Sequence, residues 1–83
     1  MNFTEHVKTR NEQFGTVIFE TLSEKIFITN ETGGKILQLI EQGKEFPQIV
    51  DELSKVYEDN PEIEKDITDF INCLKENNFI ARK

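Results

Sequence analysis

Residues 15–34 read GTVIFETLSEKIFITNETGG, and this stretch decides the fold of the chain. Two runs within it, residues 16–21 and 26–29, are rich in the β-branched and aromatic side chains that favour strands. The residues between the runs, 22–25, are polar at their centre and few enough to form a hairpin loop. Upstream, residues 6–10 alternate weakly between polar and apolar side chains. The N-terminal part therefore predicts a three-stranded antiparallel sheet whose first strand is the poorest.

The rest of the chain predicts three amphipathic helices. The first begins at Asn30, a good N-cap residue, and stops at Gly43. The second begins near residues 46–47, and its apolar residues recur at the spacing of one buried helical face. The third opens at residues 59–62, where a cap residue precedes a proline and an acid. Residues 77–78 should end it, and residues 79–80 should fold back onto the core.

The order of these elements favours an α+β fold. A small antiparallel sheet has to bury one face, and three short helices can cover it. Short connections between the helices are typical of helix-turn-helix units. We therefore expect one winged helix-turn-helix domain over residues 1–83, in which residues 1–5 are disordered.

Both faces of the predicted hairpin carry large apolar side chains. If the loop closes around residues 23–24, Phe19 pairs with Ile28. One face then carries Val17, Phe19, Ile26 and Ile28, and the other carries Ile18 and Phe27. A sheet covered by helices on one side needs only one apolar face. The second face is either covered by residues 1–14, which include Phe3 and Phe14, or is a surface for a partner.

Composition and charge exclude several classes of protein. The chain has 83 residues, of which 10 are basic and 16 acidic, for a net charge of −6. Nucleic-acid binding normally uses Lys and Arg to release phosphate counterions, so the balance favours a protein or peptide partner. No apolar run approaches the roughly 18 residues of a membrane helix, and the N-terminus has no apolar signal core. We therefore expect a cytoplasmic protein that does not bind membranes.

Residues with catalytic or ligand-binding potential are sparse. His6 has no nucleophile or carboxylate at a recognisable spacing, and Cys73 lies among acids that disfavour its thiolate. One His and one Cys cannot supply the four ligands of a usual structural zinc site. Gly33 and Gly34 form too short a motif for a phosphate loop and instead predict a close approach of a neighbouring element. We predict no enzyme, no metal and no cofactor.

The chain resembles the PqqD-like proteins, also called RiPP recognition elements, over about residues 6–80. The resemblance rests on GTVIFETLSEKIFITNETGGKILQLIEQG, then FPQIVDELSKVY, then EIEKDITDFINCLKENNFI. The matching core and cap positions are Asn30, Thr32, Gly33, Ile36, Leu37, Gly43, Ile49, Leu53, Tyr57, Ile67, Phe70, Leu74 and Ile80. Two positions depart from the family pattern: Thr29 stands where the family usually has Leu, and Asn78 where it often has Gly.

The resemblance implies a protein that captures the leader of a ribosomally made precursor peptide and presents it to a modifying enzyme, often a radical SAM enzyme. The leader would add as a strand to the edge of the sheet and send side chains into a groove against the third helix. The peptide-binding residues would be Lys25, Ile26, Phe27, Ile28 and Thr29 on the strand, with Asp66, Phe70, Cys73 and Asn77 on the helix. The apolar residues of the leader would pack against Phe70 and against Ile26 or Ile28.

The residues themselves agree with this site, because residues 25–29 would form a short, apolar edge strand, which is hazardous unless it has a use. The alternative is a winged-helix DNA-binding regulator, whose recognition helix should be basic. Both candidate helices are acidic, at residues 51–58 and 62–69. The sequence leaves open the leader sequence, the product, the class of modifying enzyme, and whether the protein is a monomer or a homodimer.

Overall fold

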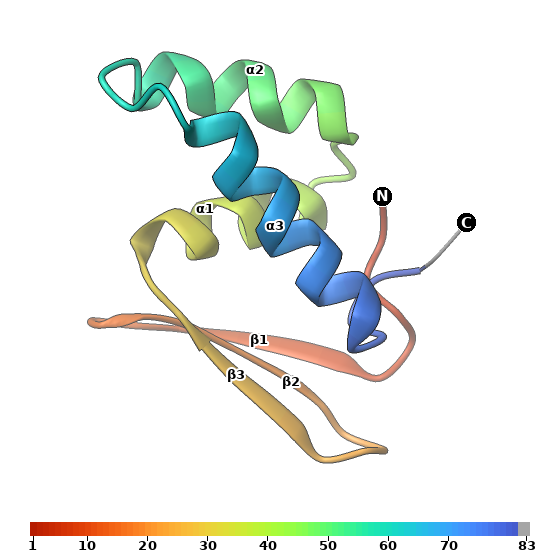
Figure 1. Cartoon of the computed structure of the whole chain (residues 1–83). Helices are drawn as coiled ribbons and strands as arrows, with labels where there is room; N and C mark the ends of the chain where they lie inside the picture. The colour runs from red at the N-terminus through yellow and green to blue at the C-terminus, as the bar shows by residue number, and fades with distance from the viewer. Residues whose placement is uncertain (82–83) are drawn as a thin grey trace.

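A computed structural model describes residues 1–81 and places three strands before three helices (Figure 1). The strands are β1 (Val7–Glu12), β2 (Gly15–Glu20) and β3 (Lys25–Thr29). The helices are α1 (Glu31–Glu41), α2 (Phe46–Val56) and α3 (Ile63–Glu76). The predicted α+β fold is confirmed, and its arrangement is that of a winged helix-turn-helix.

The sheet is antiparallel, with β2 between β1 and β3. Phe19 pairs with Ile26, so the predicted pairing of Phe19 with Ile28 is wrong by two residues. The loop causes the difference: the Glu20 carboxylate accepts hydrogen bonds from the backbone N–H and the hydroxyl of Ser23, at 2.6 and 2.7 Å. This bonding closes the turn over residues 21–24. Because side chains alternate with a period of two, the error leaves every side chain on its predicted face.

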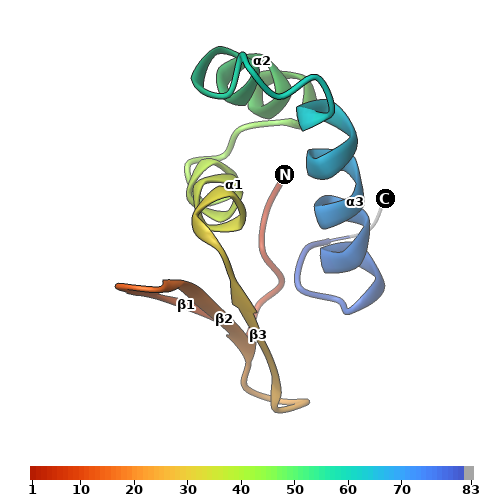
Figure 2. The same ribbon diagram turned by 60° about the vertical axis from the view of Figure 1, so that its left-hand side comes forward.

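The helices cover only one face of the sheet (Figure 2). Ile18, at the centre of that face, is completely buried. The core that it joins consists of Ile18, Ile36, Leu37, Leu39, Ile40, Ile49, Leu53, Ile63, Ile67, Ile71, Leu74, Phe79 and Ile80. Phe79 and Ile80 fold back after α3 as predicted, following Asn78, whose φ of +64° reverses the chain.

Residues 1–5, for which we expected disorder, lie along the end of the described chain in the structure. Phe3 pairs with Ile80, the Thr4 amide donates to the Phe79 carbonyl at 2.9 Å, and the Ala81 amide donates to the Asn2 carbonyl at 3.1 Å. Phe3 packs against the core on the helical side of the sheet. The segment therefore leaves the outer face uncovered, and Phe14 is 62% exposed.

The predicted first helix begins as expected, whereas the third begins later. The Asn30 side chain caps α1 by accepting from the Gly33 amide at 2.9 Å. Residues 59–62 form a turn in place of the first turn of α3. There the Asn60 side chain accepts from the Glu62 amide at 3.0 Å, which stabilises the turn and delays the helix to Ile63.

Candidate functional site

The two edges of the sheet differ in how they are protected. Edge strands expose unpaired backbone groups, and charged side chains on the strand discourage pairing with other chains. β1 carries Lys8, Arg10 and Glu12, whereas β3 carries only Lys25. β3 is therefore the edge that is open to an added strand.

The side chains of β3 divide cleanly between the two faces. Phe27 points to the helical side and packs edge-on against Phe79, with ring centroids 5.1 Å apart. Ile26 and Ile28 point outward and are 64% and 67% exposed. Neither isoleucine lies on the groove side, so the expectation that one of them would do so is wrong.

Phe70 of α3 and Thr29 at the C-terminal end of β3 both lie against Gly33 of α1. A Cβ built on Gly33 would lie 2.8 Å from the Thr29 Cβ and 3.1 Å from the Phe70 Cε1. Since real Cβ atoms do not come so close, only glycine allows Thr29 and Phe70 to meet α1 at this point. The close approach predicted for Gly33 is confirmed, and so is that of Gly34, where a Cβ would lie 2.6 Å from the Thr16 hydroxyl.

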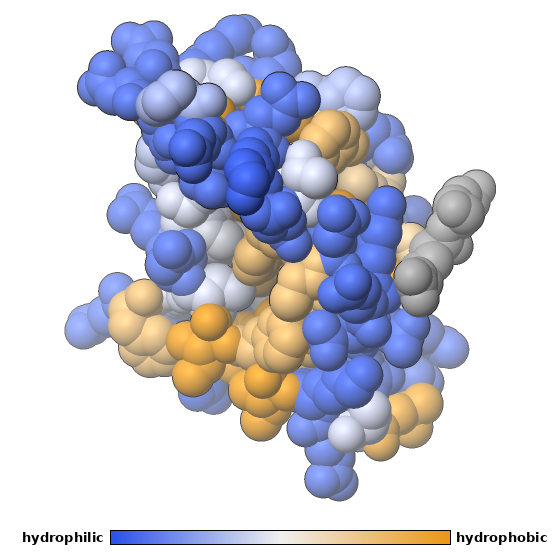
Figure 3. Space-filling model, viewed as in Figure 1, coloured by the Kyte–Doolittle hydropathy of each residue, from blue (hydrophilic) through white to orange (hydrophobic). Residues whose placement is uncertain are grey.

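A cavity of about 330 Å³ opens beside this contact. Its lining residues come from the start of α1 and from α3, and they are Asn30, Thr32, Gly33, Ile36, Asp66 and Phe70. The space-filling view shows apolar side chains on the surface along β3 and between the strand and α3 (Figure 3). The cavity itself lies between α1 and α3, and we use the term groove for this cavity together with the apolar surface between it and β3.

The four predicted residues of α3 share one side of the helix. Asp66, Phe70, Cys73 and Asn77 follow each other at intervals of three and four residues. Asp66 and Phe70 line the cavity, whereas Cys73 and Asn77 continue the same side toward the end of the helix. The Asn77 side-chain amide donates to the Cys73 carbonyl at 2.9 Å and lies 3.7 Å from its sulfur, which fixes both side chains.

The predicted residues at the two ends of β3 have different surroundings. Thr29 is buried, and its hydroxyl donates to the Thr16 carbonyl at 3.0 Å, so its side chain holds the sheet together. Lys25 is half-buried, and its backbone stands opposite that of Glu20 in the hairpin register. Of the strand, Ile26, Phe27 and Ile28 offer side chains to a partner.

Four lining residues were not among the predicted site residues. Asn30 was assigned to capping and Thr32, Gly33 and Ile36 to core or cap positions, and the structure places them also in the wall of the cavity. Their spacing after Asn30 follows the first turns of α1, which could have signalled a common side. What the sequence could not reveal is that this turn faces Phe70.

The charges around the groove are unevenly compensated. Asp69 pairs with Lys65 at 3.2 Å. Asp66 receives only a hydrogen bond from the Asn60 side-chain amide, at 3.3 Å, and no ion pair within residues 1–81 includes it. Asp66 is exposed at the rim of the cavity and is thus available to a cation.

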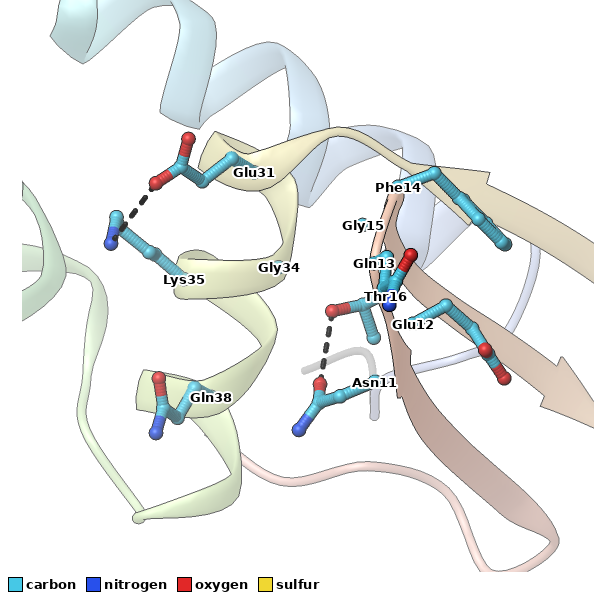
Figure 4. Close-up of a pocket in the computed structure, with 10 residues that line it drawn as sticks. All are labelled: Asn11, Glu12, Gln13, Phe14, Gly15, Thr16, Glu31, Gly34, Lys35 and Gln38. Carbon is cyan, nitrogen blue, oxygen red and sulfur yellow. Dashed lines mark hydrogen bonds and ion pairs between the residues drawn. The ribbon is translucent and has the colours of Figure 1, made fainter.

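A larger cavity lies elsewhere, between the β1–β2 turn and α1 (Figure 4). It has a volume of about 570 Å³, and its polar groups largely bond to each other. The Thr16 hydroxyl donates to the Asn11 side chain at 3.1 Å, and Lys35 pairs with Glu31 at 3.8 Å. This arrangement suits a solvated surface hollow.

The described part of the chain contains no cluster of three His, Cys, Asp or Glu side chains able to hold a metal ion. Over residues 1–81, no helix has the length and apolarity needed to span a membrane. His6 faces Glu5, with 3.7 Å between Nε2 and Oε1, and Cys73 is half-buried.

Comparison with known proteins places this geometry in a family. The chain is similar to a solved structure described as TbiB1 in complex with the TbiA(beta) leader peptide, with a TM-score of 0.89, 24% identity, and coverage of 100% of this chain and 98% of the other. It is also similar to a lasso peptide synthetase B1 complexed with the leader peptide, with a TM-score of 0.83, 22% identity, and coverage of 96% and 95%. These identities show a shared fold.

No curated protein matches the chain by sequence. The model of the family described as coenzyme PQQ synthesis protein D (PqqD) matches residues 15–80, from the start of β2 to the residue that pairs with Phe3. Since the match covers most of the chain, including the open edge strand and α3, this chain belongs to the PqqD family.

Proposed function

We propose that the chain binds the leader segment of a ribosomally made precursor peptide as a fourth strand on β3. The observation that carries the proposal is an unprotected, apolar edge strand beside a groove walled by α3. Both similar structures were solved with a leader peptide bound, which supports the same role here.

Strand addition divides the work between backbone and side chains. The peptide backbone pairs with the free N–H and C=O groups of β3, each bond worth about 0.5–1.5 kcal/mol net. Alternate side chains of the peptide enter the groove beside Phe27, Phe70 and Cys73. Asp66 at the rim favours a Lys or Arg flanking the apolar residues of the leader.

The protein acts as a carrier of its peptide and not as a catalyst. It presents the bound precursor to a modifying enzyme, for which a radical SAM enzyme is the candidate, and it does so in the cytoplasm as a single domain of residues 1–83. Neither a metal nor a cofactor is required for strand addition.

The surface gives no support to the DNA-binding alternative. The exposed sides of α2 and α3 carry Asp51, Glu52, Glu64, Asp66 and Asp69. These carboxylates would repel phosphates at either candidate recognition helix.

The test begins with selection of binders from a displayed library of random peptides, since the leader is unidentified. The best binder is synthesised and added to the protein during amide hydrogen exchange. We expect residues 25–29 to gain protection, because their free backbone groups become paired. Protection confined to α2 or to the N-terminal segment would place the site elsewhere. Submicromolar, sequence-dependent binding of duplex DNA in a gel-shift titration would overturn the function itself.

A further inference from the structure

The outer face of the sheet has two rows of side chains that end abruptly at β3. Lys8 pairs with Phe19 and Phe19 with Ile26, which forms one row. The second row runs from Arg10 through Val17 to Ile28. Directly paired residues on one face have Cβ atoms about 4.5–5.5 Å apart, so each row is a line of touching side chains.

Exposure along these rows is concentrated at the open edge. Val17 and Phe19 are half-buried in the middle of the sheet, whereas Ile26 and Ile28 are among the most exposed large apolar residues of the described chain. On the opposite side the rows end in two cations, Lys8 and Arg10. The apolar surface therefore ends at cations on the β1 side and remains open on the β3 side, toward the position that a fourth strand would occupy.

We propose that this outer surface also contributes to peptide selectivity, by contacting the peptide side chains that point away from the groove. The inference rests on the proposed strand addition to β3. A fourth strand would extend both rows by one residue each, and these two residues stand two apart in the peptide, as Ile26 and Ile28 do in β3. The residue between them lies beside Phe27 and points into the groove.

The peptide therefore presents a run of three consecutive apolar residues. The middle one enters the groove, and the two outer ones cover Ile26 and Ile28. This pattern differs from the alternating apolar and polar residues expected if the groove alone selected the peptide. It holds for either direction of the added strand, because the alternation of faces does not depend on direction.

The peptide is the occupant favoured by the geometry. A second protein laid on the outer face would meet the charged side chains of β1 as well as the apolar ones of β3, whereas a strand added at the edge borders only Ile26 and Ile28. The apolar surface is also continuous with the backbone edge that the peptide pairs with. A peptide that contacts both the backbone edge and the apolar surface gains side-chain selectivity, which the hydrogen bonds between backbones alone do not provide.

The test compares the preferred peptides of two variants in the displayed library of random peptides. The first variant combines Ile26→Thr with Ile28→Thr, which keeps β-branched residues on the strand and removes apolar contact. The matched control combines Leu22→Thr with Val56→Thr, which removes two equally exposed apolar side chains away from the rows. Circular dichroism and thermal melting establish that both variants are folded.

The wild type and the control should select three consecutive apolar residues. The Ile26→Thr, Ile28→Thr variant should bind a synthetic peptide of this kind at least about tenfold more weakly. Its own selected peptides should keep the middle apolar residue and lose the preference at the outer two positions. Amide exchange with the selected wild-type peptide should show that its binding still protects residues 25–29.

Two results would overturn the inference while leaving the proposed function intact. One is selection of peptides that are apolar only at every second position. The other is unchanged peptide affinity in the Ile26→Thr, Ile28→Thr variant, with wild-type self-association that this variant loses, which would make a second copy the occupant. If the library yields no binder at all, the proposed function fails and this inference fails with it.

Discussion

The two edges of the sheet lie beside different hollows, which have opposite chemistry. At β3 the neighbouring groove is lined by Phe70 and Ile36 with one carboxylate, Asp66. At β1 the neighbouring hollow, of about 80 Å³, is bordered by Thr9, Asn11, Gln38 and Glu41 among others. The backbone offers unpaired groups at both edges, so the side chains decide which edge accepts a partner.

This contrast shows that an edge strand accepts a partner strand when it lacks charged side chains. β1 keeps Lys8 and Arg10 on its outer face, so an added strand there would have to cover cations. β3 lacks such charges between Lys25 and its end, and α3 supplies apolar surface beside it. Four changes can break or sharpen the contrast.

The largest effect is expected from a charge placed in the wall of the groove at β3. Cys73→Glu puts a carboxylate beside the apolar peptide side chains and should weaken binding about 100-fold, or about 2.7 kcal/mol. The control is Asn72→Glu, at an exposed position one residue away, which should bind normally. Fluorescence anisotropy with a labelled selected peptide measures both.

Cys73→Ala should retain peptide binding and precursor processing, because the wall stays apolar and the proposed function gives the thiol no catalytic role. If a Cys73→Ala protein that folds and binds the peptide no longer supported processing, the thiol would take part in catalysis and this prediction would be wrong.

The next change removes the protection of β1. Lys8→Val with Arg10→Val makes the outer side of β1 resemble that of β3 and should promote weak edge-to-edge association, with a dissociation constant on the order of 100 μM. Lys8→Gln with Arg10→Gln, which removes charge without adding apolar surface, should not do so. Sedimentation velocity over a range of concentrations distinguishes the variants. If peptide affinity also rose at β1, the groove beside β3 would not be needed for binding.

A smaller effect is expected from the charge at the rim. Asp66→Asn should weaken binding of a peptide with flanking Lys or Arg about threefold, or about 0.7 kcal/mol, and should flatten the salt dependence of binding. Asp69→Asn is the matched control, because Asp69 already pairs with Lys65. Equal effects of the two changes would mean that the total negative charge of α3, and not the position of Asp66, favours the basic peptide.

The smallest effect concerns the loop that holds β3. Hydrogen bonds from the backbone N–H and the hydroxyl of Ser23 lower the pKa of the Glu20 carboxyl below its ordinary value of 4.5. The stabilisation is then present above pH 4.5 and is lost as the pH falls through the lowered pKa of the folded protein. The melting temperature of Glu20→Gln should lie slightly below that of the wild type above pH 4.5, and the two should converge in more acidic solution.

Ser23→Ala retains the backbone donor and should show a smaller gap than Glu20→Gln. A gap that did not change with pH would mean that the charge on Glu20 does not close this loop.

Local patterns predicted most of the fold. The strand faces could be predicted because alternation depends only on parity, and the start of α1 because Asn30 is a cap residue. The register could not, because it depends on how Glu20 bonds Ser23 within the loop. The position of residues 1–5 could not either, since Phe3 meets Ile80 only in the folded chain. In both cases the structure depends on a specific contact between residues, which the periodicity of apolar residues cannot predict.

The secondary-structure elements that form the site could be predicted, whereas the orientation and contacts of each site residue could not. A strand next to an amphipathic helix could be identified from the pattern, which placed Asp66 and Phe70 on the same side of α3. That Phe27 alone among the apolar residues of β3 faces the helices followed only from the packing of Phe27 on Phe79. The inward role of Thr29 likewise depended on its bond to Thr16, across the hairpin.

Gly33 is a position where the width of the groove can change without any change in the side chains that line it. A methyl group at this position would meet the Thr29 Cβ at 2.8 Å and the Phe70 ring at 3.1 Å, so the strand end and the ring would have to move apart. A residue of α1 thus sets the distance between α3 and the end of β3. Selection for a bulkier or slimmer peptide can act on a single small residue at the root of α1, and relatives that diverge there would inherit the same chemistry in a groove of different width.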